Sequence, residues 1–274
     1  MLAADDFFKL QSLNSSFKGD SATLEAPVFS LSTKKDLSIW EWVSVDGKKR
    51  VRVVPSVLGR ATIHDKDVLT YVVSCLVHKS NGDLPISKTV RFKAYDYFKL
   101  TGNGIRGEDY KRLDLALSRL KGTMLETNIV TNKIEVKEVF GLIEKASLVR
   151  KNGKLDCVEV TLSDWLFGAI ENLEVLTLSD QYFKLRKPLE KRLYEIAKKH
   201  CGNQSSWKIS IENLQQKANS TASLKEFKRM LKKIIETDLT PDYRMFLERR
   251  GDHVIFYLKD PGKLAKAIGF KSCA

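Results

Sequence analysis

The residues best suited to binding a charged partner lie in one segment near the C-terminus. Its apolar residues recur at helical spacing and predict a buried stripe of Leu224, Phe227, Leu231 and Ile234. The other faces carry five cations, and between positions 225 and 233 only Glu226 opposes them. These cations are Lys225, Lys228, Arg229, Lys232 and Lys233. Such a helix can dock on its own domain through the stripe and lie in the major groove of duplex DNA.

The flanking residues agree with this interpretation. Ser223 followed three positions later by Glu226 predicts a capping box, and therefore a helix start at Ser223. A predicted hairpin follows, with Arg249 and Arg250 in its tip, where they could neutralise phosphates. The alternative, a solvated basic helix and a solvated hairpin tip, stays open.

The charge of the chain is unevenly distributed. The 274 residues include 47 Lys and Arg against 34 Asp and Glu, a formal charge of +13. Residues 1–178 contribute 26 against 23, or +3, whereas residues 179–274 contribute 21 against 11, or +10. A localised excess of this kind favours a phosphate-binding surface in the C-terminal part over a general solubility effect.

The elements around the basic helix form a recognisable series. Pro188 starts a predicted helix that ends at His200, and a strand at 207–210 follows. A short helix, a polar turn, the basic helix and the hairpin complete the C-terminal half. A short helix, a second helix and a hairpin are typical of a winged-helix domain.

The N-terminal half predicts the same order. A buried helix from His64 to Lys79 precedes a strand, a short helix, a helix from Glu108 to Gly122 and several β segments. A predicted hairpin of 37–45 and 51–53 lies before the buried helix, and the β segments after it are Met124–Val130, Lys133–Ile143, and a hairpin that turns at Asn152–Gly153 before Val158–Leu162. We therefore predict an α+β fold with two winged-helix domains in tandem, at 27–176 and 177–274. Residues 1–26 are expected to be a mobile N-terminal tail.

The first domain carries a weaker version of the basic surface. Its cations Arg106, Lys111, Arg112 and Arg119 suggest a secondary DNA contact or a protein interface. Asp109 and Asp114 lie among them and dilute the charge. The sequence leaves both interpretations open.

We find no pattern typical of an enzyme, a metal site or a membrane protein. There is no phosphate-binding P-loop, no His-x-His pair and no Cys-x-x-Cys pair, so we expect no catalytic residue, metal or cofactor. Asp65 and Asp67 could hold magnesium, but acids in a first helical turn also favour the helix dipole. The four cysteines are expected to be reduced, three of them in the core. No run of about 18 apolar residues exists, and the acidic N-terminus does not fit a signal peptide, so a cytoplasmic protein is expected.

Five segments in register resemble the replication initiator protein A family of plasmid initiators. They are Ala61–Tyr71, Tyr110–Met124, Thr127–Ile129, Phe140–Leu142 and Leu193–His200. The resemblance spans about Pro27 to Leu258. It departs from the family at His64, where we expect a tryptophan, and this change concerns the core of the first domain.

The resemblance implies a function. It implies two winged-helix domains that recognise direct origin repeats, the iterons, with the C-terminal domain as the main major-groove reader. The reader helix would be Ser223–Ile235 and its first-domain counterpart Glu108–Lys121, with wings at Arg249–Asp252 and Met124–Val136. It also implies an N-terminal dimer interface, with monomers that open the origin and dimers that silence it.

We therefore expect a double-stranded DNA-binding plasmid replication initiator without a small-molecule substrate or a membrane partner. It would melt the adjacent origin, recruit the host initiator and replicative helicase, and repress its own gene. A transcriptional repressor with the same fold remains an alternative. A nicking-type replication enzyme is a further alternative, from a different class.

Overall fold

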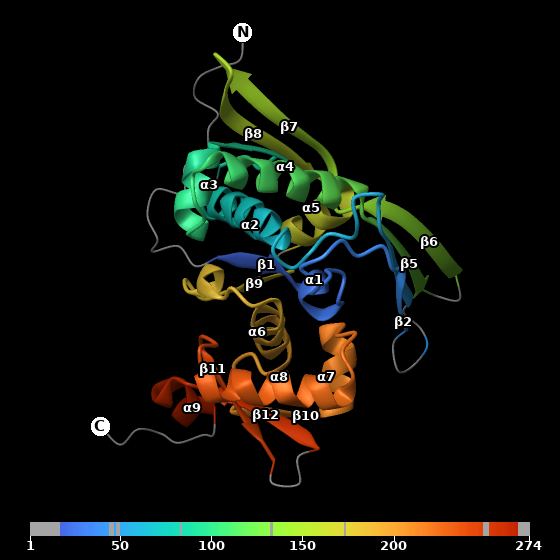
Figure 1. Ribbon diagram of the computed structural model, residues 1–274, viewed down its shortest axis with the longest axis vertical. Helices are drawn as coiled ribbons and strands as arrows, with labels where there is room; N and C mark the ends of the chain where they lie inside the picture. Colours follow the sequence, from blue (N-terminus) through green and yellow to red (C-terminus); the bar gives the residue numbers. More distant parts are fainter. Residues whose placement is uncertain are drawn as a thin grey trace. The chain divides into compact units, whose positions relative to one another are not determined.

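The computed structural model describes residues 17–43, 47, 50–82, 84–131, 134–172, 174–248 and 252–267. The chain divides into two compact units (Figure 1). Unit 1 contains the described residues of Met1–Asp20 and Val28–Thr177, and unit 2 those of Ser21–Pro27 and Leu178–Ala274. The short segment Ser21–Pro27 thus belongs with the C-terminal unit, although it lies near the N-terminus of the chain.

Unit 1 is organised around α2 (Lys66–Asn81), in which every residue from Lys66 to Val77 is buried. This confirms the helix predicted over His64–Lys79, with its start moved so that Asp65 is the N-cap residue. Tyr71 packs its ring against Phe92 and Tyr97, with centroid distances of 4.9 and 5.4 Å. The other helices of the unit are α3 (Ala94–Thr101), α4 (Gly107–Gly122) and α5 (Asp164–Glu171).

The described strands of unit 1 form three sheets. Strand β1 (Lys18–Asp20) pairs with β9 (Val175–Thr177). A second sheet has the order β2-β3-β5-β6, and a third has the order β4-β8-β7, all antiparallel. The bounds in these two sheets are β2 Trp40–Val43, β3 Arg50–Val54, β4 Thr89–Phe92, β5 Met124–Thr131, β6 Ile134–Gly141, β7 Ile143–Lys151 and β8 Lys154–Leu162.

Unit 2 is organised around α6 (Pro188–His200), whose residues from Leu189 to Ala197 are all buried. Helix α1 (Ser21–Glu25) joins it through Arg192, which donates to the carbonyl oxygens of Leu24 at 2.9 Å and Lys217 at 2.9 Å. A three-stranded sheet in the order β10-β12-β11 completes the core. The remaining bounds are η1 Tyr182–Lys184, β10 Ser206–Ser210, α7 Ile211–Ala218, α8 Leu224–Thr237, β11 Tyr243–Leu247, β12 His253–Leu258 and α9 Pro261–Ala267.

The two units share one topology. In unit 2 the chain runs α6, β10, α7, α8, β11, β12, and β12 lies in the centre of its sheet. In unit 1 it runs α2, β4, α3, α4, β7, β8, and β8 lies in the centre. Strands β5 and β6 are an insertion between α4 and β7 that pairs with β3 instead. The repeated order predicted from the sequence is therefore present.

Several expectations change at the level of single elements. Residues 18–25, assigned from the sequence to a tail, form β1 and α1. The single strand predicted over Lys133–Ile143 is divided at Leu142 into β6 and the start of β7, which lie in different sheets. Cys75, Cys157 and Cys201 are buried free thiols, as predicted. Within the described ranges, no helix is both long enough and apolar enough to cross a membrane.

Candidate DNA-binding surfaces

Helix α8 is held in place by one apolar stripe. Phe227, Leu231 and Ile234 are buried, as the periodicity predicted. The Ser223 side chain accepts a hydrogen bond from the backbone N–H of Glu226 at 3.3 Å and so caps the helix. This is one half of the predicted capping box, because the Glu226 carboxylate instead accepts from Arg229.

The cations of α8 fall into two groups. Lys225, Lys232 and Lys233 are exposed and have no hydrogen-bond or ion-pair partner among the described residues. Arg229 binds both carboxylate oxygens of Glu226, at 2.8 and 2.6 Å, and this hydrogen bonding lowers the pKa of Glu226. Lys228 lies 3.9 Å from Asp252, the residue before β12. Three lysines are therefore immediately available to an anion.

The hairpin after α8 is formed by β11 and β12, but Arg249 and Arg250 lie outside the described residues. The residue before the tip, Glu248, accepts from Lys208 at 2.8 Å and lies 3.3 Å from the His253 ring nitrogen Nδ1. The contribution of Arg249 and Arg250 to a DNA surface stays a prediction.

Helix α4 has the same place in unit 1, but three of its four cations have acidic partners, and Lys121 near its C-terminal end is exposed without a partner among the described residues. The backbone N–H of Arg106 donates to Asp109 at 2.9 Å, and the Arg112 guanidinium pairs with the same carboxylate. The backbone hydrogen bond and the two adjacent cations hold the pKa of Asp109 below its ordinary value. Lys111 pairs with Glu108 at 2.9 Å. A phosphate would have to compete with these carboxylates.

Arg119 lies in a different environment from the one expected. It forms a double ion pair with Asp65, at 2.7 and 2.6 Å, and its side chain is 22% exposed. Arg119 was expected to contribute to a secondary DNA contact or a protein interface. Position 119 instead faces the N-terminus of α2, where Asp65 is the N-cap residue. Arg119 therefore connects two helices of unit 1.

The hairpin expected to be the wing of the first domain also differs from the one at the matching position in the structure. The hairpin in the position of β11–β12 is β7–β8, because it pairs with β4 as β11–β12 pairs with β10. The segment Met124–Val136, assigned to the wing by resemblance, belongs to the inserted β5–β6 hairpin. The β7–β8 tip carries exposed Arg150 and Lys151, which the sequence analysis did not single out. The signal was available as two cations beside the Asn152–Gly153 turn.

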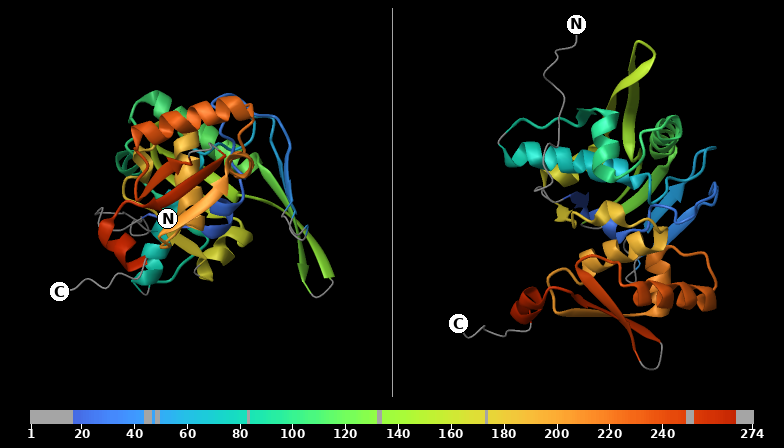
Figure 2. Two further views of the ribbon diagram at one scale, coloured as in Figure 1. Left: turned by 90° about the horizontal axis from the view of Figure 1, so that it is seen from below. Right: turned by 60° about the vertical axis from the view of Figure 1, so that its left-hand side comes forward.

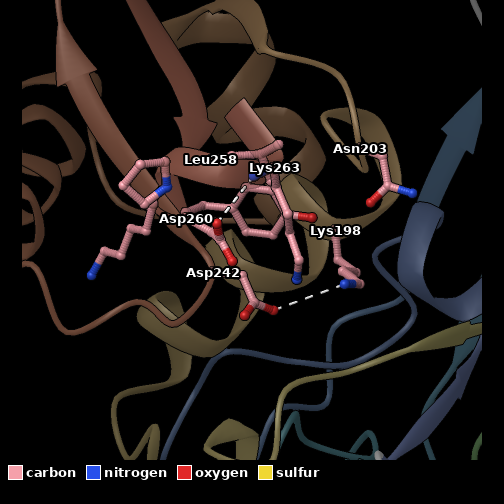
Figure 3. Close-up of a pocket in the computed structure, with 9 residues that line it drawn as sticks. Lys198, Asn203, Asp242, Leu258, Asp260 and Lys263 are labelled. Atoms are coloured by element: carbon pink, nitrogen blue, oxygen red, sulfur yellow. Dashed lines mark hydrogen bonds and ion pairs between the residues drawn. The ribbon is translucent and has the colours of Figure 1, made fainter. Parts of the chain in front are cut away.

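Unit 2 also contains a pocket of about 510 Å³ beside α9 (Figure 3). The two carboxylates that line it, Asp242 and Asp260, already accept hydrogen bonds from other groups of the protein. Asp242 accepts from the Tyr194 hydroxyl at 3.0 Å and lies 3.8 Å from Lys198, and Asp260 accepts from two backbone N–H groups of α9. The lining residues are Lys198, Asn203, Asp242, Tyr243, Leu258, Lys259, Asp260, Pro261 and Lys263.

The residues that a metal or a nucleophile would require are dispersed. His200 stacks on Trp207 with a centroid distance of 4.8 Å, and His253 lies beside Glu248. No group of three His, Cys, Asp or Glu in the described part of the chain is arranged to hold a metal ion. Tyr71, Tyr97, Tyr194 and Tyr243 are buried, and burial raises the pKa of each hydroxyl.

Three comparisons with known proteins bear on the family and the fold of the chain. A family model described as "Replication initiator protein A" matches residues 18–245. A curated protein of Wigglesworthia glossinidia brevipalpis, named "Putative replication protein", is 39% identical over 250 residues, which cover 88% of this chain and 89% of the relative. Crystal structures of domains 2 and 3 of RctB superpose with TM-scores of 0.67 and 0.59, at 12% and 11% identity. Each covers 88% of this chain and 98% of the solved chain, and this likeness shows a shared mixed α/β fold. Together the family match and the relative show that the chain belongs to the replication initiator protein A family.

Proposed function

We propose that this chain is a plasmid replication initiator that binds duplex DNA sequence-specifically at iterons in the origin. The observation that carries the DNA contact is α8, a helix docked through Phe227, Leu231 and Ile234 that presents unpaired Lys225, Lys232 and Lys233. Family membership supports the role in initiation. The concentration of charge in residues 179–274 supports the assignment of the main contact to unit 2.

We further propose that each unit is a winged-helix domain. The support is topological, because both units place a two-helix segment between a first strand and a hairpin that pairs with it. In such domains the second helix of the pair enters the major groove and the hairpin contacts the neighbouring backbone. By this analogy α8 is the reader of unit 2.

The residues of α8 then take different roles. Ser223 fixes the helix start, Lys225, Lys232 and Lys233 neutralise phosphates, and Lys228 lies between the helix and the hairpin. Arg229 gives up its hydrogen bonds to Glu226 and binds a base edge instead, since a guanidinium can donate two hydrogen bonds to guanine O6 and N7. Arg249 and Arg250 would extend the phosphate contact along the hairpin.

Unit 1 is proposed to supply dimerisation and a second DNA contact. The sheet β2-β3-β5-β6 has two edge strands, and each carries an exposed valine, Val43 in β2 and Val139 in β6. Open strand edges can pair with a second copy of the chain. In this proposal monomers open the origin and dimers silence it or repress the gene.

No reaction or cofactor of the protein's own is needed for melting. Bending or unwinding DNA costs several kcal/mol, and binding energy together with negative superhelicity can supply it. The opened strand would then be passed to the host initiator and the replicative helicase, which the protein recruits.

A salt titration tests the proposed DNA contact. Binding of the full chain to the DNA upstream of its own gene is compared with binding to a scrambled duplex of equal length. We expect a repeat-specific complex that persists at moderate salt, with a steep dependence of log K on log salt. Equal, salt-sensitive binding to both duplexes would contradict the proposal.

A matched pair of variants assigns the contact to α8. Lys232→Ala should reduce affinity about 5-fold at 0.15 M salt and lower the salt slope by about 1. Lys184→Ala removes an equally exposed charge from η1 and should bind like the wild type. The same origin DNA, supercoiled and incubated with magnesium, should stay unnicked, and a covalent tyrosine adduct would favour the nicking-enzyme alternative.

A further inference from the structure

We propose that unit 1 contacts the phosphates of duplex DNA through the tip of its β7–β8 hairpin, at Arg150 and Lys151, and not through α4. This inference rests on the proposed function. It assigns the second DNA contact to residues outside the segments from which the family resemblance was drawn.

The first step is the partial neutralisation of α4, in which three of the four cations have acidic partners and Lys121, near the C-terminal end, has none among the described residues. Asp109 accepts from Arg112 and lies next to Arg106, Glu108 holds Lys111, and Asp65 holds Arg119. A phosphate that approaches this helix meets carboxylates already in place. Counterion release is small where the cations have internal anionic partners.

The second step is that two acidic residues of the β7–β8 hairpin are already paired with cations of unit 1. Glu159 in β8 pairs with Arg91 in β4 at 2.5 Å, and Asp156 pairs with Lys93 at 2.5 Å. Arg91 in β4 and Lys93, the residue that follows β4, thus engage two acids of the hairpin. Arg150 and Lys151 are exposed and have no hydrogen-bond or ion-pair partner in the described part of the chain.

The third step is the shape of the hairpin. Strand β4 pairs with β8 only from Val158 to Thr161, so the segment beyond Val158 is two-stranded. At about 3.3 Å per residue this segment extends roughly 17 Å to the turn. Figures 1 and 2 show it projecting past the helices of unit 1.

The fourth step is the rigidity of the tip. Asn152 and Gly153 both have positive φ, 51° and 76°, which is the geometry of a tight type I′ turn. A register shift between Val149 and Arg150 marks a bulge beside the tip, and bulges increase strand twist. Lys93 is the N-cap residue of α3, and its ion pair with Asp156 connects the bulged region to that helix. A short, fixed and cationic hairpin of this kind fits a DNA backbone.

The test compares double variants of the full chain in the same salt titration. Arg150→Ala/Lys151→Ala should lower affinity for origin DNA about 10- to 30-fold at 0.15 M salt and reduce the salt slope by about 2. Lys34→Ala/Lys35→Ala removes two adjacent exposed cations elsewhere in unit 1 and should bind like the wild type. Hydroxyl-radical footprinting should show one protected backbone segment lost in the tip variant alone.

The outcomes separate this inference from the proposed function. If the tip variant binds and footprints like the wild type while Lys232→Ala loses affinity, the hairpin contact is overturned and the α8 contact stands. If Lys111→Ala/Arg112→Ala loses more affinity than the tip variant, α4 is the contact and the inference is overturned. If wild-type binding is not specific, the proposed function itself fails. Thermal unfolding of each variant verifies that the fold is intact.

Discussion

Helices α4 and α8 occupy the same position in two units of the same topology, but their cations have different neighbours. On α4, Lys111, Arg112 and Arg119 have acidic partners, and of its four cations Lys121 alone has none among the described residues. On α8, Lys225, Lys232 and Lys233 have none among the described residues. The number of cations on a helix therefore does not measure its capacity to bind a polyanion. The partners that the fold supplies decide how much of that charge is available.

The strongest test of this difference removes the unpaired charge of α8. Lys225→Ala/Lys232→Ala/Lys233→Ala should weaken origin binding about 100-fold at 0.15 M salt, since each lost phosphate contact costs about 5-fold. The measurement is fluorescence anisotropy with labelled origin DNA. A loss below 10-fold would mean that the unpaired lysines are merely solvated.

Arg119 provides the opposite test, because the structure gives it a role within unit 1. Arg119→Ala leaves Asp65, whose side chain is 4% exposed, without its cation. We expect a loss of roughly 2 kcal/mol in the free energy of unfolding, since breaking a buried pair is costly and Arg119 is partly exposed. Urea denaturation measures it. An unchanged stability with a large loss of DNA affinity would return Arg119 to the DNA surface.

Arg229 lies between these extremes, since it is on α8 and yet paired. Arg229→Ala should cost about 1 kcal/mol of binding, the lower end of the range for a base contact, because the Glu226 pair must first be exchanged. The loss should relax specificity at one base position in a panel of mutated sites. Uniform weakening on all sequences would identify a phosphate contact instead.

The smallest expected effect comes from making α4 more like α8. Glu108→Gln/Asp114→Asn removes one acid that pairs with Lys111 and another that is exposed on the same helix. Affinity for scrambled DNA should rise about 2-fold, because exposed ion pairs contribute little and their removal frees little charge. A gain of 10-fold or more would show that α4 is close to being a reader.

Local patterns predicted α8 well and unit 1 less well. The stripe of Phe227, Leu231 and Ile234 and the cap at Ser223 depend on residues within one helix, so periodicity is sufficient to identify them. The sequence does not show which hairpin of unit 1 matches β11–β12. That depends on whether the hairpin pairs with β3 or with β4, and those partner strands are distant in sequence. Both hairpins of unit 1 alternate like strands, and alternation does not identify a partner strand.

The environment of Arg119 was hidden for the same reason. Asp65 is 54 residues away along the chain, so helical spacing could not identify it as the partner of Arg119. The order of elements and the family could be predicted from the sequence alone. The sheet partners and the ion pairs that determine available charge required the three-dimensional structure.

The placement of α1 has a consequence for how the protein is made. Thr23 and Leu24 are buried in unit 2, against a helix that begins only at Pro188. During synthesis at about 5–20 residues per second, this segment leaves the ribosome roughly ten to thirty seconds before its acceptor helix exists. Unit 1 can therefore fold while α1 waits, and unit 2 is completed by a segment that was made before most of unit 1. The nascent chain cannot hold α1 in its final place until α6 has been made.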